Sequence, residues 1–426
     1  MLAATPGTAG QRNPTLRAPT RVGTWAAPVT AQPVSKVYTL ADQTVRQVVH
    51  ASIGGDQPQV RFSNEFGAHP VRIGAATLGL RAGSGASTDL VPGTGQPLTF
   101  AGRPDAIIPA GGTLISDSAD LVVPPGGDLV ISLYLPERTE VGTVTPLAYQ
   151  TNLVAPGNLT GVDKTGADKT GADKIGADKT GADKTATDKA SSAVAQSSYV
   201  FLSGVSVRAR RSTSAIVAFG DSITRGARTV ENANHRWPDL LAARLRDGNI
   251  DRGVLNTGIS RNRLLSGPIG RTGRAGSSAW AGESGLRRFE RDVLAQPEVS
   301  HVIVLLGVND LGLVTPPTID QLIAGHRDLI SRGRAAGLKM IGGTLLPFGG
   351  YRGRLDNPES RAKRDAFNAW VRRSGEYDAV ADFDAAMRDP AAPYRILPAY
   401  DSGDHLHPGD AGMAAMAAAV PLNLFE

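Results

Sequence analysis

The chain of 426 residues contains no cysteine. This absence excludes disulfide bonds, thiolate nucleophiles and cysteine-ligated metal sites, but it leaves the cellular compartment open. Aromatic residues make up only 5%, and the net charge of +5 is a small excess of 45 Lys and Arg over 40 Asp and Glu. Without a concentrated basic stripe interleaved with aromatics, the sequence argues against nucleic-acid binding.

Long apolar runs are also missing. None reaches the ~20 residues that span a bilayer, so we expect no membrane span. The first residues, MLAATPGTAGQRNP, have neither a basic region nor a long apolar region, and they do not form an intact signal peptide. They would fit the remnant of one if the true start lay upstream.

The length predicts two domains, because single cores stop growing near roughly 250–300 residues. Residues 1–36, rich in Pro, Thr and Ala, are expected to form an extended arm. Residues 37–210 carry short β-rich runs separated by Gly, Pro and Asp, which is typical of an antiparallel β-sandwich. The expected strands are 45–53, 60–64, 71–80, 128–135 and 199–209.

An internal repeat interrupts this region. Between residues 160 and 189 the pentad TGADK recurs six times with small variations. It has no apolar face that could offset its ordering entropy, so we interpret it as a flexible tether. Cation binding by Asp163, Asp168, Asp173 and Asp178 is the alternative, but a lysine follows each carboxylate and the spacing matches no EF-hand loop.

Residues 211–426 show a different pattern, in which apolar β-runs alternate with amphipathic stretches. Alternation of this kind predicts a parallel sheet with helices on both faces. The expected strands are 215–220, 253–258, 301–307, 339–346 and 379–384, and the expected helices are 237–248, 318–337, 361–375 and 410–420.

Polar clusters follow the first three of these strands, and a fourth precedes the last helix. They are Gly220-Asp221-Ser222, Asn256-Thr257-Gly258, Gly307-Val308-Asn309-Asp310 and the run DSGDHLHP at 401–408. Ligands of such sheets bind beyond the carboxyl ends of the strands, so we expect the four clusters on one rim. Each cluster alone is as readily a turn or an Asx loop.

Together the clusters contain the parts that acyl transfer needs: a nucleophile, a base, a group that orients the base, and donors for an oxyanion. Ser222 is the candidate nucleophile and His407 the candidate base, and Asp404, three residues earlier, can reach the imidazole through one short turn. The backbone amides of Ser222 and Gly258 and the side chain of Asn309 are the candidate oxyanion donors.

These blocks resemble the GDSL, or SGNH, hydrolase superfamily, which is named for a Ser, a Gly, an Asn and a His. The matching residues here are Ser222 in FGDSIT, Gly258 in NTGIS, Asn309 in GVND and His407 in DHLHP, with the Asp-x-x-His signature at Asp404. Runs such as NTGISRNRLL and HVIVLLGVNDLG look like the bacterial branch related to xylan-associated acetyl esterases.

The resemblance implies a three-layer α/β/α sandwich with five parallel strands that hydrolyses small-molecule or polysaccharide esters without a metal or organic cofactor. It also implies secretion, while a cytoplasmic location stays open. One departure is Arg261, which stands where that branch commonly has a glycine before Asn262. This arginine either alters the loop near the oxyanion donors or adds a positive charge at the rim.

Other residues compete for these roles. His405 is adjacent to Asp404, a poor geometry for a mutual hydrogen bond, so we expect it to line the pocket or the surface. Asp221 and Asp310 are expected to brace their loops, and His50, His69, His235, His301 and His326 to be structural. Three functions remain open: a carbohydrate deacetylase, a short-chain arylesterase or lipase, and a glycan-binding protein with an inactive hydrolase fold.

Overall fold

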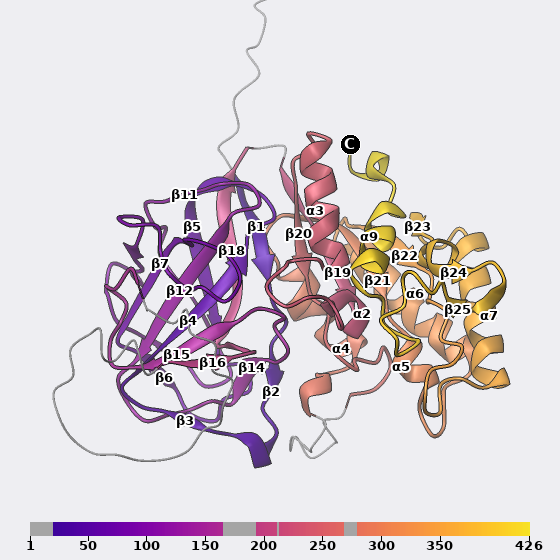
Figure 1. Cartoon of the computed structure of the whole chain (residues 1–426), viewed down its shortest axis with the longest axis horizontal. Helices are drawn as coiled ribbons and strands as arrows, with labels where there is room; N and C mark the ends of the chain where they lie inside the picture. The colour runs from indigo at the N-terminus through magenta and orange to yellow at the C-terminus, as the bar shows by residue number, and fades with distance from the viewer. Residues whose placement is uncertain (1–19, 165–192, 211–212, 268–278) are drawn as a thin grey trace, which may run out of the picture.

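The architecture was analysed in a computed structural model that describes residues 20–164, 193–210, 213–267 and 279–426. The chain divides into an antiparallel β-rich part followed by an α/β part, drawn on the left and right of Figure 1. Most of the TGADK repeat, including Asp168, Asp173 and Asp178, and the first 19 residues of the expected arm lie outside the described residues.

Two larger sheets form the β-rich part. Apolar side chains of both, such as Val60 and Phe62 in one and Val45, Val49 and Ile131 in the other, belong to one continuous core. The first sheet has the strand order β1 (Thr20–Ala26), β18 (Leu202–Ala209), β5 (Gly55–Ser63) and β10 (Thr113–Ile115), with β11 (Val122–Val123) also paired to β5. The second has the order β16 (Val194–Gln196), β15 (Asn152–Pro156), β4 (Gln43–His50), β12 (Asp128–Leu135), β7 (Ala75–Leu80) and β8 (Gln96–Pro97).

Strand β1 lies in the described end of the expected extended arm, residues 20–36. It pairs with β18 along its length, and Val22 is fully buried. The expected strand 71–80 is divided into β6 (Val71–Ile73) and β7, and the expected strand 199–209 into β17 (Tyr199–Val200) and β18. The second division falls at Phe201, whose positive φ of 54° breaks an extended strand.

Short strands and turns complete this part of the chain. They are β2 (Thr30–Ala31), β3 (Thr39–Leu40), β9 (Ala106–Ile108), β13 (Thr139–Glu140), β14 (Thr143–Thr145) and the 3₁₀ turn Val34–Lys36.

The α/β part is built on a parallel sheet. Its strand order is β20-β19-β21-β22-β23, and every neighbouring pair is parallel. Consecutive residues of β19 and β21 are buried although they point to opposite faces, so both faces are covered. The strands are β19 (Ser214–Gly220), β20 (Arg252–Asn256), β21 (Val299–Leu305), β22 (Lys339–Gly343) and β23 (Ala379–Ala381).

The helices fall into two contacting groups, α3 with α8 and α9, and α4 with α6 and α7. Local signals set their ends: Thr318 and Gln321 form a capping box at the start of α6, and Asn357 caps α7 ahead of Pro358. The helices are α2 (Ser222–Arg225), α3 (Trp237–Asp247), α4 (Gly285–Phe289), which continues into a π-helical turn (Glu290–Leu294), α5 (Val308–Leu311), α6 (Ile319–Ala335), α7 (Pro358–Arg373), α8 (Phe383–Met387) and α9 (Asp410–Ala418). Short elements are β24 (Arg388–Asp389), β25 (Ala392–Ile396) and the 3₁₀ turns Ala279–Ala281 and Leu422–Phe425.

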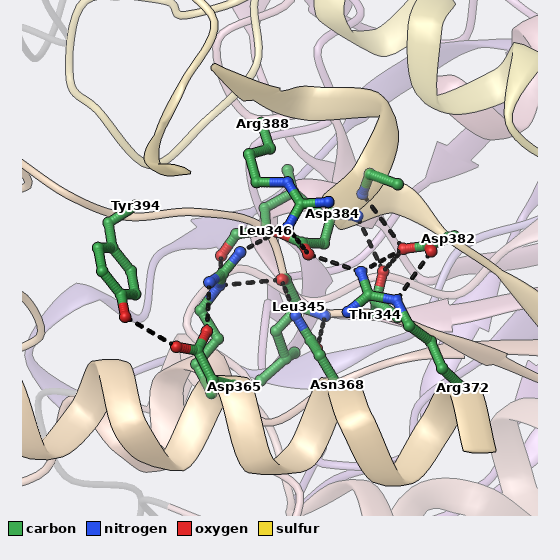
Figure 2. Close-up of polar contacts among 12 residues, drawn as sticks. Thr344, Leu345, Leu346, Asp365, Asn368, Arg372, Asp382, Asp384, Arg388 and Tyr394 are labelled. Atoms are coloured by element: carbon green, nitrogen blue, oxygen red, sulfur yellow. Dashed lines mark hydrogen bonds and ion pairs between the residues drawn. The ribbon is translucent and has the colours of Figure 1, made fainter. Parts of the chain in front are cut away.

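A buried ion-pair network holds the segment after β22 (Figure 2). Arg364 of α7 donates to the carbonyl oxygen of Leu346 over 2.9 Å and to the carboxylate of Asp384. Arg372 bonds both Asp382 and Asp384 at 2.6 Å. Since Asp384 is buried, these arginines neutralise it, and the network fixes α7 and α8 at the carboxyl end of the sheet.

The two parts of the chain meet at edge strands, β1 of the first sheet and β20 of the parallel sheet (Figure 1). The backbone amide of Val254 in β20 donates to the hydroxyl of Ser52 over 3.0 Å, which satisfies a donor that an edge strand would otherwise leave unpaired. In the described parts of the chain, no helix has the length and apolar character needed to traverse a bilayer.

Candidate active site

Ser222, His407 and Asp404 form one hydrogen-bonded chain. The Ser222 hydroxyl lies 2.9 Å from Nε2 of His407, and Nδ1 of His407 lies 2.8 Å from Oδ2 of Asp404. Ser222 is 8% exposed, so the residue is largely buried. This arrangement lets the imidazole accept a proton from the serine while the carboxylate fixes its orientation.

Ser222 owes its position to the turn between β19 and α2. Asp221 caps the helix, since its side chain accepts the amide of Ile223 over 2.9 Å, and Gly226 ends the helix with a positive φ of 96°. The amide of Ser222 lies in the first turn of α2 and therefore has no acceptor within the helix.

Asp404 and His407 share one tight loop. The other carboxylate oxygen of Asp404 accepts the backbone amides of Leu406 and His407 at 3.0 and 2.9 Å. Although burial alone would raise the pKa of Asp404, these amides and the imidazole of His407 hold it well below its usual range. Asp404 is therefore a permanent anion beside the imidazole.

His405 belongs to a different pair. Its Nδ1 lies 2.5 Å from Oδ2 of Asp401, and its backbone has a positive φ of 65°. Its side chain is 47% exposed, whereas that of His407 is 15% exposed. His405 therefore lies at the surface, and it is His407 that contacts Ser222.

Asn309 and Gly258 approach the same region from neighbouring loops. The side-chain amide of Asn309 donates one hydrogen to the carbonyl oxygen of Asn262 over 3.0 Å, which leaves its second hydrogen for another acceptor. The amide of Gly258 donates to the side chain of Asn256 over 3.0 Å. Gly258 can therefore serve as an oxyanion donor only if this bond is exchanged or shared.

Close packing explains why residue 258 is a glycine. A Cβ there would lie 2.4 Å from the backbone nitrogen of Arg225 and 2.8 Å from the backbone carbon of Thr224. No side chain can be accommodated against the backbone of α2, so glycine allows this loop to lie directly beside the helix that begins with Ser222.

Arg288 of α4 is a bracing residue that the sequence analysis did not identify. It is fully buried and donates to the carbonyl oxygens of Gly220 and Thr257 at 2.8 and 2.7 Å and to Oδ1 of Asn262 at 2.9 Å. One side chain thus ties together the ends of β19 and β20 and the loop after Gly258. Because α4 is too short to give a periodic pattern, nothing in the sequence distinguished this arginine from the other basic residues.

Asp310 and Asn262 hold the remaining loops. The carboxylate of Asp310 accepts the backbone amides of Leu264 and Leu265 at 2.8 and 3.0 Å, and Asn262 donates to the carbonyl oxygens of Ala281 and Glu283. Arg261, the departure from the family pattern, is exposed with a φ of 63°, so the loop accommodates it in a left-handed conformation.

Two buried carboxyl groups beside the candidate site have raised pKa values. Burial raises the pKa of Asp221 to about 7 and that of Asp310 to about 6. The second carboxyl oxygen of Asp221 has no partner in the described residues, in keeping with a group that is costly to ionise there. Neither carboxyl contacts the Ser222 hydroxyl.

The other histidines are engaged elsewhere. His326 is buried between the hydroxyl of Tyr377 and the carbonyl oxygen of Leu306, and burial lowers its pKa to about 3. The remaining pairs are His50 with Asp128, His235 with Asp410 and His301 with Ser300, while His69 is exposed.

Comparison with known proteins gives one family match. Residues 218–415 match the model of the GDSL-like Lipase/Acylhydrolase family, a span that includes Ser222, Gly258, Asn309, Asp404 and His407. No curated protein matches the chain.

Several solved structures are similar to part of the chain. A lipase/acylhydrolase from Enterococcus faecalis is 20% identical, with a TM-score of 0.38, over 48% of this chain and 92% of that one. A carbohydrate acetylesterase from Sinorhizobium meliloti is 18% identical, with a TM-score of 0.37, over 48% and 95%. An aryl esterase from M. smegmatis is 18% identical, with a TM-score of 0.38, over 48% and 95%. Likeness at this level does not identify a substrate. The match over residues 218–415 supports a carboxylic-ester hydrolase.

Proposed function

We propose that this hydrolase cleaves esters through an acyl-enzyme on Ser222, with His407 as general base and Asp404 as its orienting anion. The observation that carries the proposal is the continuous chain of hydrogen bonds from the Ser222 hydroxyl through the imidazole to the carboxylate, at 2.9 and 2.8 Å. Two separate loops would have no physical reason to meet in this way if Ser222 were only a helix-initiating residue.

The reaction follows from these contacts. His407 takes the hydroxyl proton as Oγ of Ser222 bonds to the ester carbonyl carbon, and the imidazolium is stabilised by Asp404. The tetrahedral intermediate then expels the alcohol, which leaves with the proton from His407. Water, deprotonated by the same imidazole, attacks the acyl-enzyme and releases the carboxylic acid and free Ser222.

The oxyanion of the intermediate needs donors aimed at it. The amide of Ser222 and the second side-chain hydrogen of Asn309 are the donors we assign first. We assign Gly258 as a third donor that becomes available when its amide exchanges the side chain of Asn256 for the substrate.

For the substrate, we propose an acetylated carbohydrate such as xylan. The sequence runs around Asn256 and Asn309 resemble the branch of xylan-associated acetyl esterases. A short-chain arylesterase or lipase is the competing assignment.

We also propose the domain division on which this function depends. A β-sandwich domain would cover residues 37–210 together with strand β1, which pairs into its first sheet, and a three-layer SGNH domain would cover residues 211–426. The two antiparallel sheets support the first domain, and the parallel sheet with both faces buried supports the second.

The first test uses Ser222→Ala with p-nitrophenyl acetate and a fluorophosphonate probe. We expect the wild type to hydrolyse the ester and be labelled on Ser222, and the variant to lose both properties. Retention of more than a few per cent of turnover, or absence of labelling in the wild type, would contradict the assignment. The second result would favour an inactive, glycan-binding protein.

The substrate is tested separately. We expect acetate release from acetylated xylan to exceed hydrolysis of C6–C10 aryl esters at equal enzyme concentration. If the longer esters turn over while acetylated xylan does not, the carbohydrate assignment fails and the esterase assignment stands.

A further inference from the structure

The segment from Gly226 to Arg236, here called the bridging segment, connects α2 to α3. It leaves the helix that carries Ser222 and runs between the β-rich part and the loop that carries Asp404. Its hydrogen bonds, and those of the adjoining Arg225, reach both neighbours.

On one side the contacts go to residues 146–151 of the β-rich part. Arg225 donates through Nε to the carbonyl oxygen of Leu147 over 3.0 Å and through Nη2 to that of Pro146 over 2.8 Å. The backbone amide of Asn232 donates to the carbonyl oxygen of Tyr149 over 3.0 Å. The side chain of Asn232 accepts the amide of Thr151 over 2.6 Å and donates to the hydroxyl of that residue over 2.9 Å.

On the other side the contacts go to the triad loop and the helix that follows it. Nε of Arg228 lies 3.1 Å from Oδ2 of Asp404, the oxygen that also binds His407. The amide of Val230 donates to Oδ1 of Asp410 over 3.0 Å. The bridging segment therefore links the β-rich part directly to the carboxylate of the triad.

The character of Arg225 strengthens this link. It is 5% exposed, its hydrogen bonds go to neutral carbonyl oxygens, and burial lowers its pKa to about 10. A buried guanidinium is costly unless its donors are satisfied, so α2 cannot move away from residues 146 and 147 without leaving this cation unpaired.

Backbone strain gathers at the same junction. Leu147, Tyr149 and Arg228 have positive φ angles of 54°, 52° and 74°. Residues other than glycine adopt this conformation uncommonly, because it costs free energy that other interactions must offset. Leu147, Tyr149 and Arg228 each take part in one of the hydrogen bonds of this junction.

We propose that the β-rich part is a component of the catalytic apparatus, because it positions both halves of the triad. Through Arg225 it fixes the helix of the nucleophile, and through Asn232 and Arg228 it fixes the carboxylate that orients the base. Arg225, Arg228 and Asn232 are positioning residues, since they act through Ser222 and Asp404 and not on the substrate. The inference rests on the proposed serine-esterase function.

The test compares Arg225→Gln, Arg228→Gln, Arg228→Lys and Asn232→Leu with Arg61→Gln in the full chain. Arg61 is the matched control, because it also donates to a carbonyl oxygen across the junction, that of Ala295 at 3.1 Å. Within the described residues, its side chain forms no hydrogen bond with the triad or the bridging segment. For each protein, kcat and KM for p-nitrophenyl acetate are measured over a range of pH, together with Tm.

We expect kcat to fall about 10–100-fold in Arg225→Gln and Arg228→Gln with little change in KM, because misplacement of reacting groups by about 1 Å has such an effect. The kcat of Asn232→Leu should also be lower than that of the wild type. Arg228→Lys should regain part of the kcat lost in Arg228→Gln, and the kcat of Arg61→Gln should stay within about twofold of the wild type. In Arg228→Gln the acidic limb of the kcat/KM profile should move to higher pH, since a positive charge near the imidazole is lost.

Equal kcat values in the wild type and in Arg228→Gln, with superimposable pH profiles, would overturn the proposal. Arg228 is 61% exposed along its side chain, so this variant remains informative even if Arg225→Gln does not fold. A parallel loss in Arg61→Gln would also overturn it, because the effect would then be general to the junction. If the wild type itself hydrolysed no ester, the proposed function and not the positioning would have failed.

Discussion

Asn309 donates its side-chain amide to the backbone carbonyl of Asn262 across 3.0 Å. This bond joins α5, the short helix after β21, to the loop after β20, and it sets the plane of the Asn309 amide. Because Asn262 is itself held by the buried Arg288, the second amide hydrogen of Asn309 has a fixed direction before any substrate binds. A donor oriented in advance is what stabilisation of an oxyanion requires.

Replacement of Asn309 by alanine should therefore lower kcat about 10²–10³-fold, the usual loss for one oxyanion donor. KM for a short aryl ester should change little, since the bond strengthens only in the transition state. Asn158→Ala, at an exposed residue of the β-rich part, is the control and should keep the wild-type kcat. A loss below about fivefold at Asn309 would remove this residue from the oxyanion site.

The two histidines of the terminal loop offer a sharp comparison, because each has its own aspartate partner. His407→Ala should lower kcat at least about 10⁴-fold, and Asp404→Asn about 10⁴-fold, since the imidazole would lose the anion that fixes its tautomer. His405→Ala and Asp401→Asn should remain within about fivefold of the wild type, because the Asp401 carboxylate binds the His405 ring and nearby backbone amides and not the imidazole of His407. Steady-state kinetics of all four variants, with Tm as a check on folding, decides the matter; equal losses at both histidines would contradict the assignment.

Gly258→Ala tests whether close packing of the second loop on α2 supports the candidate site. The added methyl group would lie 2.4 Å from the backbone nitrogen of Arg225, so the loop or the helix must move. We expect a lower Tm and a decrease in kcat of at least about tenfold, because displacement by about 1 Å is costly. Gly161→Ala, where nothing lies within 4 Å, should leave both quantities unchanged. Wild-type kcat in a folded Gly258→Ala protein would show that the close approach is not needed for activity.

The sequence predicted the elements that carry strong periodic patterns. The five parallel strands and helices α3, α6, α7 and α9 lie within a few residues of the expected ranges, because apolar runs and helix caps are local signals. Composition alone could not show the pairing of β1 with β18, in which Thr20 lies opposite Ala209.

The roles of Arg288 and Arg225 could not be predicted from the sequence for a related reason. Arg288 acts through carbonyl oxygens of Gly220 and Thr257, and Arg225 through those of Pro146 and Leu147. Backbone acceptors leave no side-chain signature, so neither arginine could be distinguished from a solvated one. The candidate residues Ser222, Asn309 and His407, by contrast, stood in short motifs with a recognisable order.

The buried carboxyl of Asp221 leads to a prediction about stability and pH. Burial raises its folded-state pKa to about 7, whereas in the unfolded chain an aspartate titrates near 4. Between about pH 4 and 7 the folded protein therefore retains a proton that the unfolded chain has released, so stability should fall as pH rises through this window. The contribution is about 4 kcal/mol at most, from roughly 1.4 kcal/mol for each pH unit between the two pKa values. Asp221→Asn keeps an oxygen to cap α2 but does not titrate, and shares every other group with the wild type. Urea unfolding at pH 5 and 7.5 should thus show the wild type losing more stability than the variant over this interval; parallel losses would mean that Asp221 is ionised in the folded protein and that a partner for its second oxygen exists.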